Sequence, residues 1–419
     1  MVLQNCTTDC PAPYNTFLNG VFTVDASVEL YPANRGTDDD GRVRVPDMVL
    51  PLEQSNGSGG FNLPVILSSP TDQFSTTFTL PTNIEQVYLD VVSQSQSTDE
   101  QWYACFPNDL AAITELFGCG NTDFRATEIT IDGQPAGLAP VSPWVYTGFL
   151  PDQWVPAPGI QTLDFVPYRV NLTPFAAMLN DGNPHTVSLS VFNDDSYFSE
   201  TASLLLFLDK RSTQVTGALV KNTLAAPSPV VTENLQGTST VTGTIGVKSD
   251  RKFTISGYVN TSHGKVSTSI QEHQNFSSTS TIDFDTVNFT VLNQDTSVQN
   301  KVSKVTTIGD RDGKHVANSN FSFPIKLSVV YPVPAADFGL TVDTTQTFHT
   351  DSQVFGDHGL QQFSSVTDTG NASDVSPAKS SQEYTAFDSS GHFYDCKIAS
   401  KNNTLTKVSG GCSDHDHGR

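Results

Sequence analysis

The chain has 419 residues, of which 37% are hydrophobic, so it can bury more than one core and we expect two or three domains. It carries 44 acidic residues against 22 Lys and Arg, a formal net charge of -22. That charge repels a phosphate backbone and an anionic lipid surface alike, so we expect neither nucleic acid nor a membrane as a partner.

Short runs of alternating β-branched and aromatic residues recur along the chain, separated by Gly, Pro, Asn and Asp. The predicted strands are Phe22–Val28, Phe78–Pro81, Gln86–Val92, Thr127–Ile131, Thr186–Phe192, Leu204–Leu208, Phe253–Val259, Val287–Val291 and Ile325–Val330. This spacing indicates an all-β fold of two jelly-roll or β-sandwich domains side by side, with few short helices. One helix is predicted where Thr173 can cap, Pro174 suits the first helical position and Phe175–Leu179 follow. A second short turn is predicted over Leu110–Phe117.

Composition shifts suggest where the domains begin and end. We expect an N-terminal segment over 1–16, a first β-sandwich domain over 17–211, a linker over 212–240, a second β-sandwich domain over 241–350 and a polar segment over 351–419. The core of the second domain should reach about residue 330, and the polar segment could complete it. The chain starts with MVLQNCTTDC, which has no apolar run of signal-peptide length, so we expect the natural start to lie upstream.

Six cysteines fall into sequence-local pairs, which predicts disulfides in an oxidising compartment, although several connectivities are open. The pairs are Cys6 with Cys10, Cys105 with Cys119, and Cys396 with Cys412. Free buried thiols are the alternative, and zinc is disfavoured because no C-x-x-C or paired His ligands accompany the cysteines. Glycosylation sequons also favour a protein that is secreted or held in a vacuolar or lysosomal lumen; they start at Asn5, Asn56, Asn171, Asn260, Asn275, Asn288, Asn320, Asn371 and Asn402.

An acidic pair runs into two aromatic residues in the block DEQWY. In an extended strand, Glu100 and Trp102 would share one face, and Asp99 and Tyr103 the other. A carboxyl beside an indole loses hydration, which raises its pKa and keeps it protonated in mildly acidic medium as a proton donor. Glu100 is therefore the first candidate for a catalytic carboxyl and Asp99 the second. The alternative is that Trp102 and Tyr103 are core residues and the acids are solvated loop charges.

Further aromatic residues lie in the proline-rich segments SPWVYTG and DQWVPAPG. Trp102 and Tyr103, together with Trp144, Tyr146 and Trp154, are the candidates for binding the apolar faces of sugar rings, with domain packing as the alternative for each.

Charged residues near these segments have several interpretations. Arg125 could pair with a catalytic acid or a glycan hydroxyl, or form a plain surface ion pair. Asp132 is predicted to lie in a hairpin turn because Asp-Gly supplies positive φ, whereas Asp152 and Asp164 could line a cleft but fit loop roles better. Asp209 is predicted to cap a turn or linker. Calcium-loop and phosphate-loop patterns are incomplete, so we expect no metal and no cofactor.

The order and spacing of four blocks closely resemble those of the peptide-N-glycosidase A family, also called peptide-N4-(N-acetyl-β-glucosaminyl)asparagine amidase A. The blocks are DEQWYACFPN from Asp99, TEITIDGQPAGLAPVSPWVYTGFLPDQWVPAPGIQTLDFVPYRVNLTPF from Thr127 to Phe175, DGNPHTVSLSV from Asp181 and SLLLFLD from Ser203, and the resemblance extends over about Phe17 to Val330. It implies hydrolysis of the amide bond that joins an N-glycan to asparagine, which leaves aspartate in the peptide and releases the glycan without a metal. The resemblance also implies that Glu100 and Asp99 belong to the site.

Relatives in this family carry an upstream Phe/Tyr-Asp-Arg motif that has no counterpart here, so the chain could hold only part of the machinery. We expect a monomer that acts on N-glycosylated peptides or proteins. One alternative is a β-sandwich that binds glycans or glycopeptides without catalysis. A less favoured alternative is a glycoside hydrolase with two carboxylates about 5 to 9.5 Å apart.

Overall fold

The computed structural model describes residues 45–55, 61–62, 64–112, 119–145, 160, 166–285, 287, 290–310, 313–330, 341–373, 377–389, 391–402 and 404–412. The chain divides into two compact units, Met1–Arg44 and Val45–Arg419, and all described residues belong to the second. The predicted strand Phe22–Val28 and the pair Cys6 with Cys10 lie outside the described residues, as do Tyr146, Asp152, Trp154 and Asp164.

Two antiparallel sheets form a sandwich in the first part of this unit. One has the strand order β1-β11-β6-β9 with β4 also paired to β11, and the other has the order β5-β10-β7-β8. The strands are β1 (Met48–Pro51), β4 (Val65–Leu67), β5 (Phe74–Thr79), β6 (Ile84–Gln96), β7 (Ala126–Ile131), β8 (Gln134–Pro140), β9 (Tyr168–Asn171), β10 (Pro184–Phe192) and β11 (Tyr197–Leu208). A short ribbon pairs β2 (Gln54–Ser55) with β3 (Phe61–Asn62).

Alternating side chains build the core between the two sheets. Val87, Leu89 and Val91 occupy every second position of β6 and are buried, and they share one hydrophobic cluster with Ile129 of β7 and Leu189 of β10. Successive side chains of a strand point to opposite faces, so a period of two places these residues on the face that the other sheet covers. The strands predicted at Gln86–Val92, Thr127–Ile131, Thr186–Phe192 and Leu204–Leu208 are confirmed, whereas the one predicted at Phe78–Pro81 is confirmed only for Phe78 and Thr79, where β5 ends.

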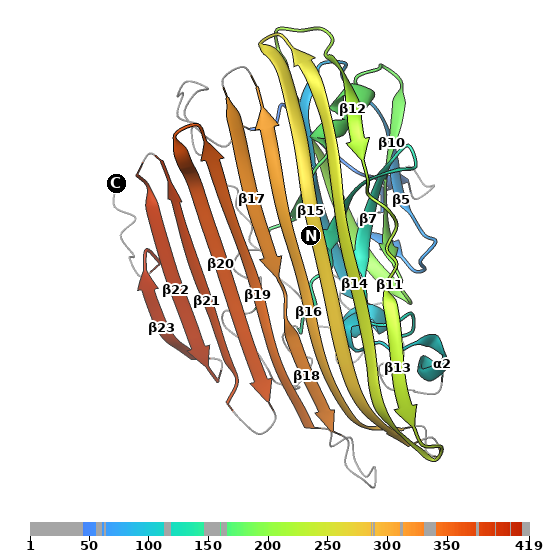
Figure 1. The fold of residues 1–419 in the computed structure, drawn as a ribbon. Coiled ribbons are helices and arrows are strands. Elements are labelled where there is room, and N and C mark those ends of the chain that lie inside the picture. Colours follow the sequence, from blue (N-terminus) through green and yellow to red (C-terminus); the bar gives the residue numbers. More distant parts are fainter. Residues whose placement is uncertain are drawn as a thin grey trace. The chain divides into compact units, whose positions relative to one another are not determined.

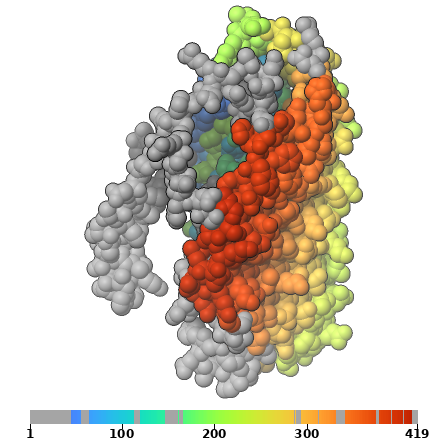
Figure 2. Space-filling model, turned by 90° about the vertical axis from the view of Figure 1, so that its left-hand side faces the viewer, coloured from blue at the N-terminus to red at the C-terminus, as the bar shows by residue number. Residues whose placement is uncertain are grey.

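A long antiparallel sheet follows, with twelve strands among the described residues (Figure 1). Its main order is β12-β14-β15-β16-β17-β19-β20-β21-β22-β23, while β13 pairs with β14, and β18 with β16 and β19. The strands are β12 (Thr216–Asn222), β13 (Val230–Gln236), β14 (Thr240–Thr261), β15 (Gly264–Asp285), β16 (Thr290–Gly309), β17 (Lys314–Ser322), β18 (Ile325–Val330), β19 (Thr341–Gly356), β20 (Gly359–Ser373), β21 (Lys379–Asp388), β22 (Phe393–Lys401) and β23 (Thr404–Gly410). Figure 2 shows β20 to β23, in red, next to one another on the viewed face.

The all-β class with few short helices is confirmed. The first part of the described chain forms two sheets, and the second part forms one long sheet. We expected a linker over 212–240 and a second sandwich after it. The described strands β12 to β23 belong to one sheet, and some of them lie in the expected linker and in the polar segment. Hydroxyl side chains pair across these strands, as between Ser380 and Ser400 at 2.8 Å and between Thr369 and Ser381 at 2.7 Å. Such cross-strand pairs of hydroxyl groups stabilise neighbouring strands, so an antiparallel sheet does not need a second sheet on each of its faces.

One face of the long sheet packs against the sandwich. Phe276 of β15 lies with its ring centroid 6.2 Å from that of Trp102 and 5.0 Å from that of Phe124. Gly257 of β14 faces the backbone of Pro174, where a Cβ atom would collide with the proline carbonyl. The sandwich and the long sheet therefore share a core.

The helices are short. They are the 3-10 helix η1 (Ser97–Ala104), α2 (Asn108–Ala111), the 3-10 helix η2 (Thr173–Phe175) and α3 (Ala176–Leu179). The helix predicted after Thr173 is confirmed, although the Thr173 hydroxyl accepts a hydrogen bond from the Val87 backbone amide rather than capping the helix. Within the described ranges, no helix is long and apolar enough to cross a membrane.

Candidate functional site

The block DEQWY lies in η1, so the predicted strand for this block is wrong. The 3-10 conformation removes the period of two that placed Glu100 beside Trp102 and Asp99 on the opposite face. Local sequence could not reveal this change, because the contacts that fix η1 come from residues far away in the chain. The helix buries Asp99, Trp102 and Tyr103 and leaves Glu100 partly exposed.

Asp99 and Arg125 form a fully buried ion pair, with 2.8 Å between Arg125 Nη2 and Asp99 Oδ1. The other Asp99 oxygen accepts backbone N–H bonds from Asp195 at 2.6 Å and Ser196 at 2.8 Å. Arg125 also donates to the carbonyl oxygens of its own neighbourhood, including that of Thr122 at 2.7 Å. Nearly every polar atom of the two side chains has a hydrogen-bond partner. Such a fully paired, buried ion pair has a structural role.

Trp102 and Tyr103 are core residues in this structure. Trp102 has no exposed surface and packs against Phe276, and Tyr103 is 1% exposed. The Tyr103 hydroxyl donates a hydrogen bond to the backbone carbonyl of Trp144 at 3.3 Å. The two aromatic residues of the block therefore connect η1 to the segment that contains Trp144.

Glu100 is the acid of the block that reaches solvent. Partial burial raises the pKa of its carboxyl. Burial raises the pKa of Tyr103 strongly, and the charge of Glu100 raises it further. Glu100 thus reaches solvent from η1, although it is not among the residues that line the cavity described below.

A cavity of about 630 Å³ lies between the sandwich and the long sheet, within the size range of pockets for small ligands. On the sandwich side it is lined by β6, by β9, by the end of β8 and by the segment up to Trp144. On the other side it is lined by β16, β17, β19, β20 and β21. Of the aromatic residues predicted to bind sugars, Trp144 lines this cavity.

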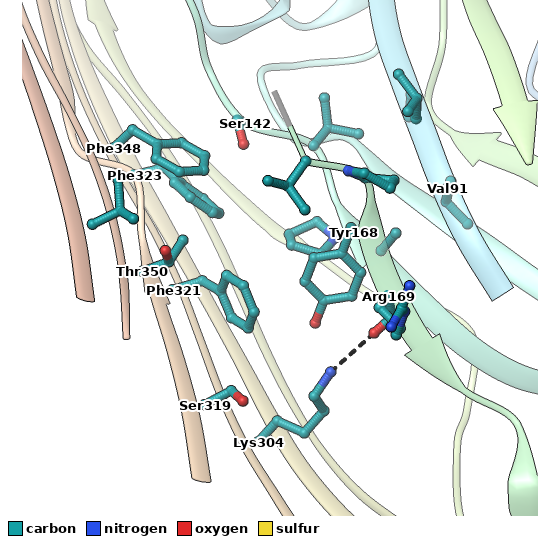
Figure 3. Close-up of a pocket in the computed structure, with 18 of the residues that line it drawn as sticks. Val91, Ser142, Tyr168, Arg169, Lys304, Ser319, Phe321, Phe323, Phe348 and Thr350 are labelled. Atoms are coloured by element: carbon teal, nitrogen blue, oxygen red, sulfur yellow. Dashed lines mark hydrogen bonds between the residues drawn. The ribbon is translucent and has the colours of Figure 1, made fainter. Parts of the chain in front are cut away.

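Aromatic rings cover much of the cavity wall (Figure 3). Phe323 and Phe348 are stacked with their centroids 4.9 Å apart, and Phe321 continues the row 6.3 Å from Phe323. Tyr168 of β9 faces this row, with 5.0 Å between its centroid and that of Phe321. Flat apolar rings with polar groups between them suit a ligand that has both apolar faces and hydroxyl groups.

A protonatable carboxyl lies directly behind the cavity wall. Ser93 lines the cavity and donates a hydrogen bond to Glu200 Oε1 at 2.5 Å, while Thr127 donates to Ser93 at 2.9 Å. Burial raises the pKa of Glu200 to about 8, despite the lowering effect of the Ser93 hydrogen bond. Burial likewise raises the pKa of Asp194 to about 7, with a further rise from Asp99. Both acids therefore favour the protonated form in mildly acidic medium.

Charged side chains lie at another end of the cavity. Lys304 of β16 lines it, and its Nζ lies 5.0 Å from the Tyr168 ring centroid. Glu272 is the cross-strand neighbour of Lys304, and burial raises its pKa to about 7 although Lys304 lowers it. Burial lowers the pKa of Lys304. Glu272 is buried, whereas Lys304 is partly buried.

Sequence reasoning missed Glu200, Asp194 and Lys304. Glu200 alternates with the apolar Phe198 and Ala202 on the buried side of β11, so a charged residue in an apolar period was an available signal. Lys304 offered no such signal, because its surroundings come from β9, which is distant in sequence. Within the described ranges, no three His, Cys, Asp or Glu side chains converge as metal ligands.

Asp132 and Asp209, the other predicted carboxylates among the described residues, have structural roles. Asp132 and Gly133 have φ angles of 51° and 77° in the β7–β8 hairpin turn, which confirms the prediction, and the Asp132 carboxylate also lies 2.7 Å from His185 Nδ1. Asp209 accepts bonds from the Arg211 amide and from Ser262, as expected for a cap.

The disulfide predictions are confirmed for the described cysteines, which pair Cys105 with Cys119 and Cys396 with Cys412. Cys105 directly follows η1. The first bridge therefore closes the loop that adjoins the block DEQWY.

Comparison with known proteins identifies the family of the chain. The sequence model of the family described as peptide N-acetyl-β-D-glucosaminyl asparaginase amidase A matches residues 5–224, more than half of the chain. A peptide-N4-(N-acetyl-β-glucosaminyl)asparagine amidase A from Prunus dulcis is 28% identical over 271 residues, which cover 60% of this chain and 46% of that relative. The chain thus spans less than half the length of this relative, and no solved structure matches it. The chain belongs to the peptide N-acetyl-β-D-glucosaminyl asparaginase amidase A family.

Proposed function

We propose that the chain hydrolyses the amide bond between asparagine and the innermost N-acetylglucosamine of an N-glycan, and that the cavity beside Trp144 holds the sugar. The observation that carries this proposal is the cavity itself: aromatic rings and hydroxyl groups line it, and it adjoins the family-matched block DEQWY through the Tyr103–Trp144 hydrogen bond. Membership of the family supplies the reaction class. The disulfides fit a secreted or lumenal protein.

The reaction requires a water molecule to attack the side-chain amide carbon and a proton for the departing glycosylamine. Glu100 is the proposed catalytic acid, because it is the partly exposed carboxyl of the block and its raised pKa keeps it protonated longer as pH rises. Hydroxyl and amide groups of the cavity wall, among them Ser93, would bind the sugar. We assign Asp99 and Arg125 to the positioning of η1, because both are buried and paired.

One experiment separates the reaction classes. The purified chain is incubated at acid pH with a glycopeptide in heavy-oxygen water, and the products are analysed by mass spectrometry. An amidase converts Asn to an Asp that carries the heavy oxygen, and it releases a glycan with its innermost sugar pair intact. A glycosidase would leave one sugar on Asn, and that product would refute the proposal.

Glycan binding without catalysis is the second candidate. Its specific support is that Asp99 is neutralised by Arg125, so one of the two predicted catalytic acids is committed to structure. An unchanged glycopeptide that nevertheless binds the chain would favour this candidate. Comparison with a version extended at the N-terminus then tests whether the upstream Asp-Arg motif is what the chain needs for turnover.

A further inference from the structure

Lys304 is a cation that extends into an aromatic cavity. It projects from β16 with Ser319 and Phe321 of the neighbouring strand β17 beside it, and its Nζ lies over the rings of Tyr168 at 5.0 Å and Phe321 at 5.8 Å (Figure 3). Ring faces attract a cation through their quadrupole, and this attraction partly replaces the hydration that Lys304 has lost. The side chain is therefore held in a defined place at the cavity wall.

The ammonium group of Lys304 is under-used as a hydrogen-bond donor. A lysine ammonium has three N–H donors, and the described structure pairs one of them, with the backbone carbonyl of Arg169 at 3.2 Å. Among the described residues, no carboxylate lies within 4.0 Å of Nζ as an ion-pair partner. The donors that remain are available to a ligand in the cavity.

Neighbouring carboxylates do not neutralise this charge closely. Glu128 is taken up by Arg251, with bonds of 2.6 and 2.9 Å to the two guanidinium nitrogens. Glu272 acts on Lys304 through space without an ion-pair contact, and one of its oxygens has no hydrogen-bond partner in the described structure. Asp90 is likewise engaged by Arg169. Lys304 is partly buried against aromatic rings and has no close counter-ion, so a bound anion would supply the charge partner that the described residues do not.

We propose that Lys304 makes this end of the cavity a binding site for a carboxylate carried on a sugar ring, such as a uronic acid, whose ring lies against the aromatic wall. The carboxylate accepts the donors of Lys304, and the ring faces contact Tyr168 and Phe321. An acidic sugar is favoured over a free inorganic anion because the wall beside Lys304 is aromatic and can cover an apolar face. The site rests on cavity geometry and charge and does not depend on the proposed hydrolysis.

A binding experiment with the full chain tests the site directly. The affinities of methyl glucuronide and of methyl glucoside are measured by NMR titration; the two probes differ in a carboxylate against a hydroxymethyl group. We expect the acid to bind at least about tenfold more tightly, because one hydrogen bond between charged groups supplies that factor. Equal affinities for the two probes in the unaltered chain would overturn the proposal without any variant.

Substitutions then assign the effect to one side chain. Lys304→Gln should remove the preference for the acid, and Lys304→Arg should keep most of it because the charge and donors remain. Lys301→Gln is the matched control, since it removes the same charge from an exposed position on the other face of β16. Melting curves establish that each variant is folded. A preference that persists in folded Lys304→Gln, or disappears in Lys301→Gln, would refute the assignment.

Discussion

Two regions of the molecule bury charge in opposite ways. At η1, Asp99 and Arg125 have no exposed surface and nearly every oxygen and nitrogen is paired. Beside the cavity, Glu272 is buried and Lys304 is partly buried, but Lys304 uses one of its donors and Glu272 has an oxygen without a hydrogen-bond partner among the described residues. A buried charged group whose hydrogen-bonding atoms are all paired, which we call saturated, holds the structure in place, because any movement of it breaks several hydrogen bonds. A charged group that still has unpaired donors or acceptors can serve binding or proton transfer, because these atoms can form hydrogen bonds with a ligand.

The largest effect should come from breaking the saturated pair. Arg125→Met removes the cation and leaves Asp99 buried without its counter-charge, so we expect a loss of about 3–5 kcal/mol in the free energy of unfolding, measured by urea denaturation. Arg169→Met is the control, because its pair with Asp90 is half exposed and should be worth less than about 1 kcal/mol. Equal losses of unfolding free energy in the two variants would show that the buried pair of Asp99 and Arg125 is no more important for stability than an exposed one.

The disulfide beside η1 should have the next largest effect. Cys105 and Cys119 are 14 residues apart, and closing a loop of about that length contributes on the order of 3 kcal/mol in the chain-entropy model. Replacing both with Ala should lower stability by about that amount. Peptide mapping without reduction checks the pairing itself, and the idea fails if both thiols are free in the unaltered chain.

Glu100 tests whether the partly exposed acid is the functional one. Glu100→Gln keeps the shape and hydrogen-bonding capacity but removes the exchangeable proton, so turnover of glycopeptide should fall by roughly 100-fold while folding and binding persist. This experiment requires a form of the protein with measurable activity. Asp99→Asn should act differently: stability falls because the pair with Arg125 is weakened, and activity falls in proportion to the folded fraction. Normal turnover in Glu100→Gln would show that η1 does not supply the catalytic acid.

The sequence could reveal features that depend on neighbouring residues, but not those that depend on contacts between residues far apart in the chain. Alternation predicted β6, β7, β10 and β11, and Asp-Gly predicted the turn at Asp132, because these features depend on neighbouring residues. The conformation of η1 was mispredicted because Asp99 is held by Arg125 and by amides of Asp195 and Ser196, contacts that no local pattern encodes.

The cavity was out of reach of sequence reasoning for the same reason. Trp144 could be nominated as a ring that faces a ligand, but the wall opposite it comes from the long sheet. Lys304 meets the Arg169 carbonyl across 135 residues of chain, so its role depends on how the long sheet packs on the sandwich. Local propensity carries no information about that packing.

The last prediction concerns Glu200 and the pH dependence of stability. Burial raises its pKa from 4.5 to about 8, so the folded chain holds this proton more tightly than the unfolded chain does. Unfolding therefore releases a proton between about pH 4.5 and pH 8, and stability falls as pH rises through that window, by at most about 1.4 kcal/mol per pH unit for one group. Glu200→Gln mimics the protonated acid and should flatten the slope measured by urea denaturation from pH 5 to pH 8. Glu383→Gln, an exposed carboxyl that pairs with Lys397, should leave the slope unchanged. An identical slope in Glu200→Gln and the unaltered chain would show that Glu200 is ionised in the fold, and that the hydrogen bond from Ser93 outweighs its burial.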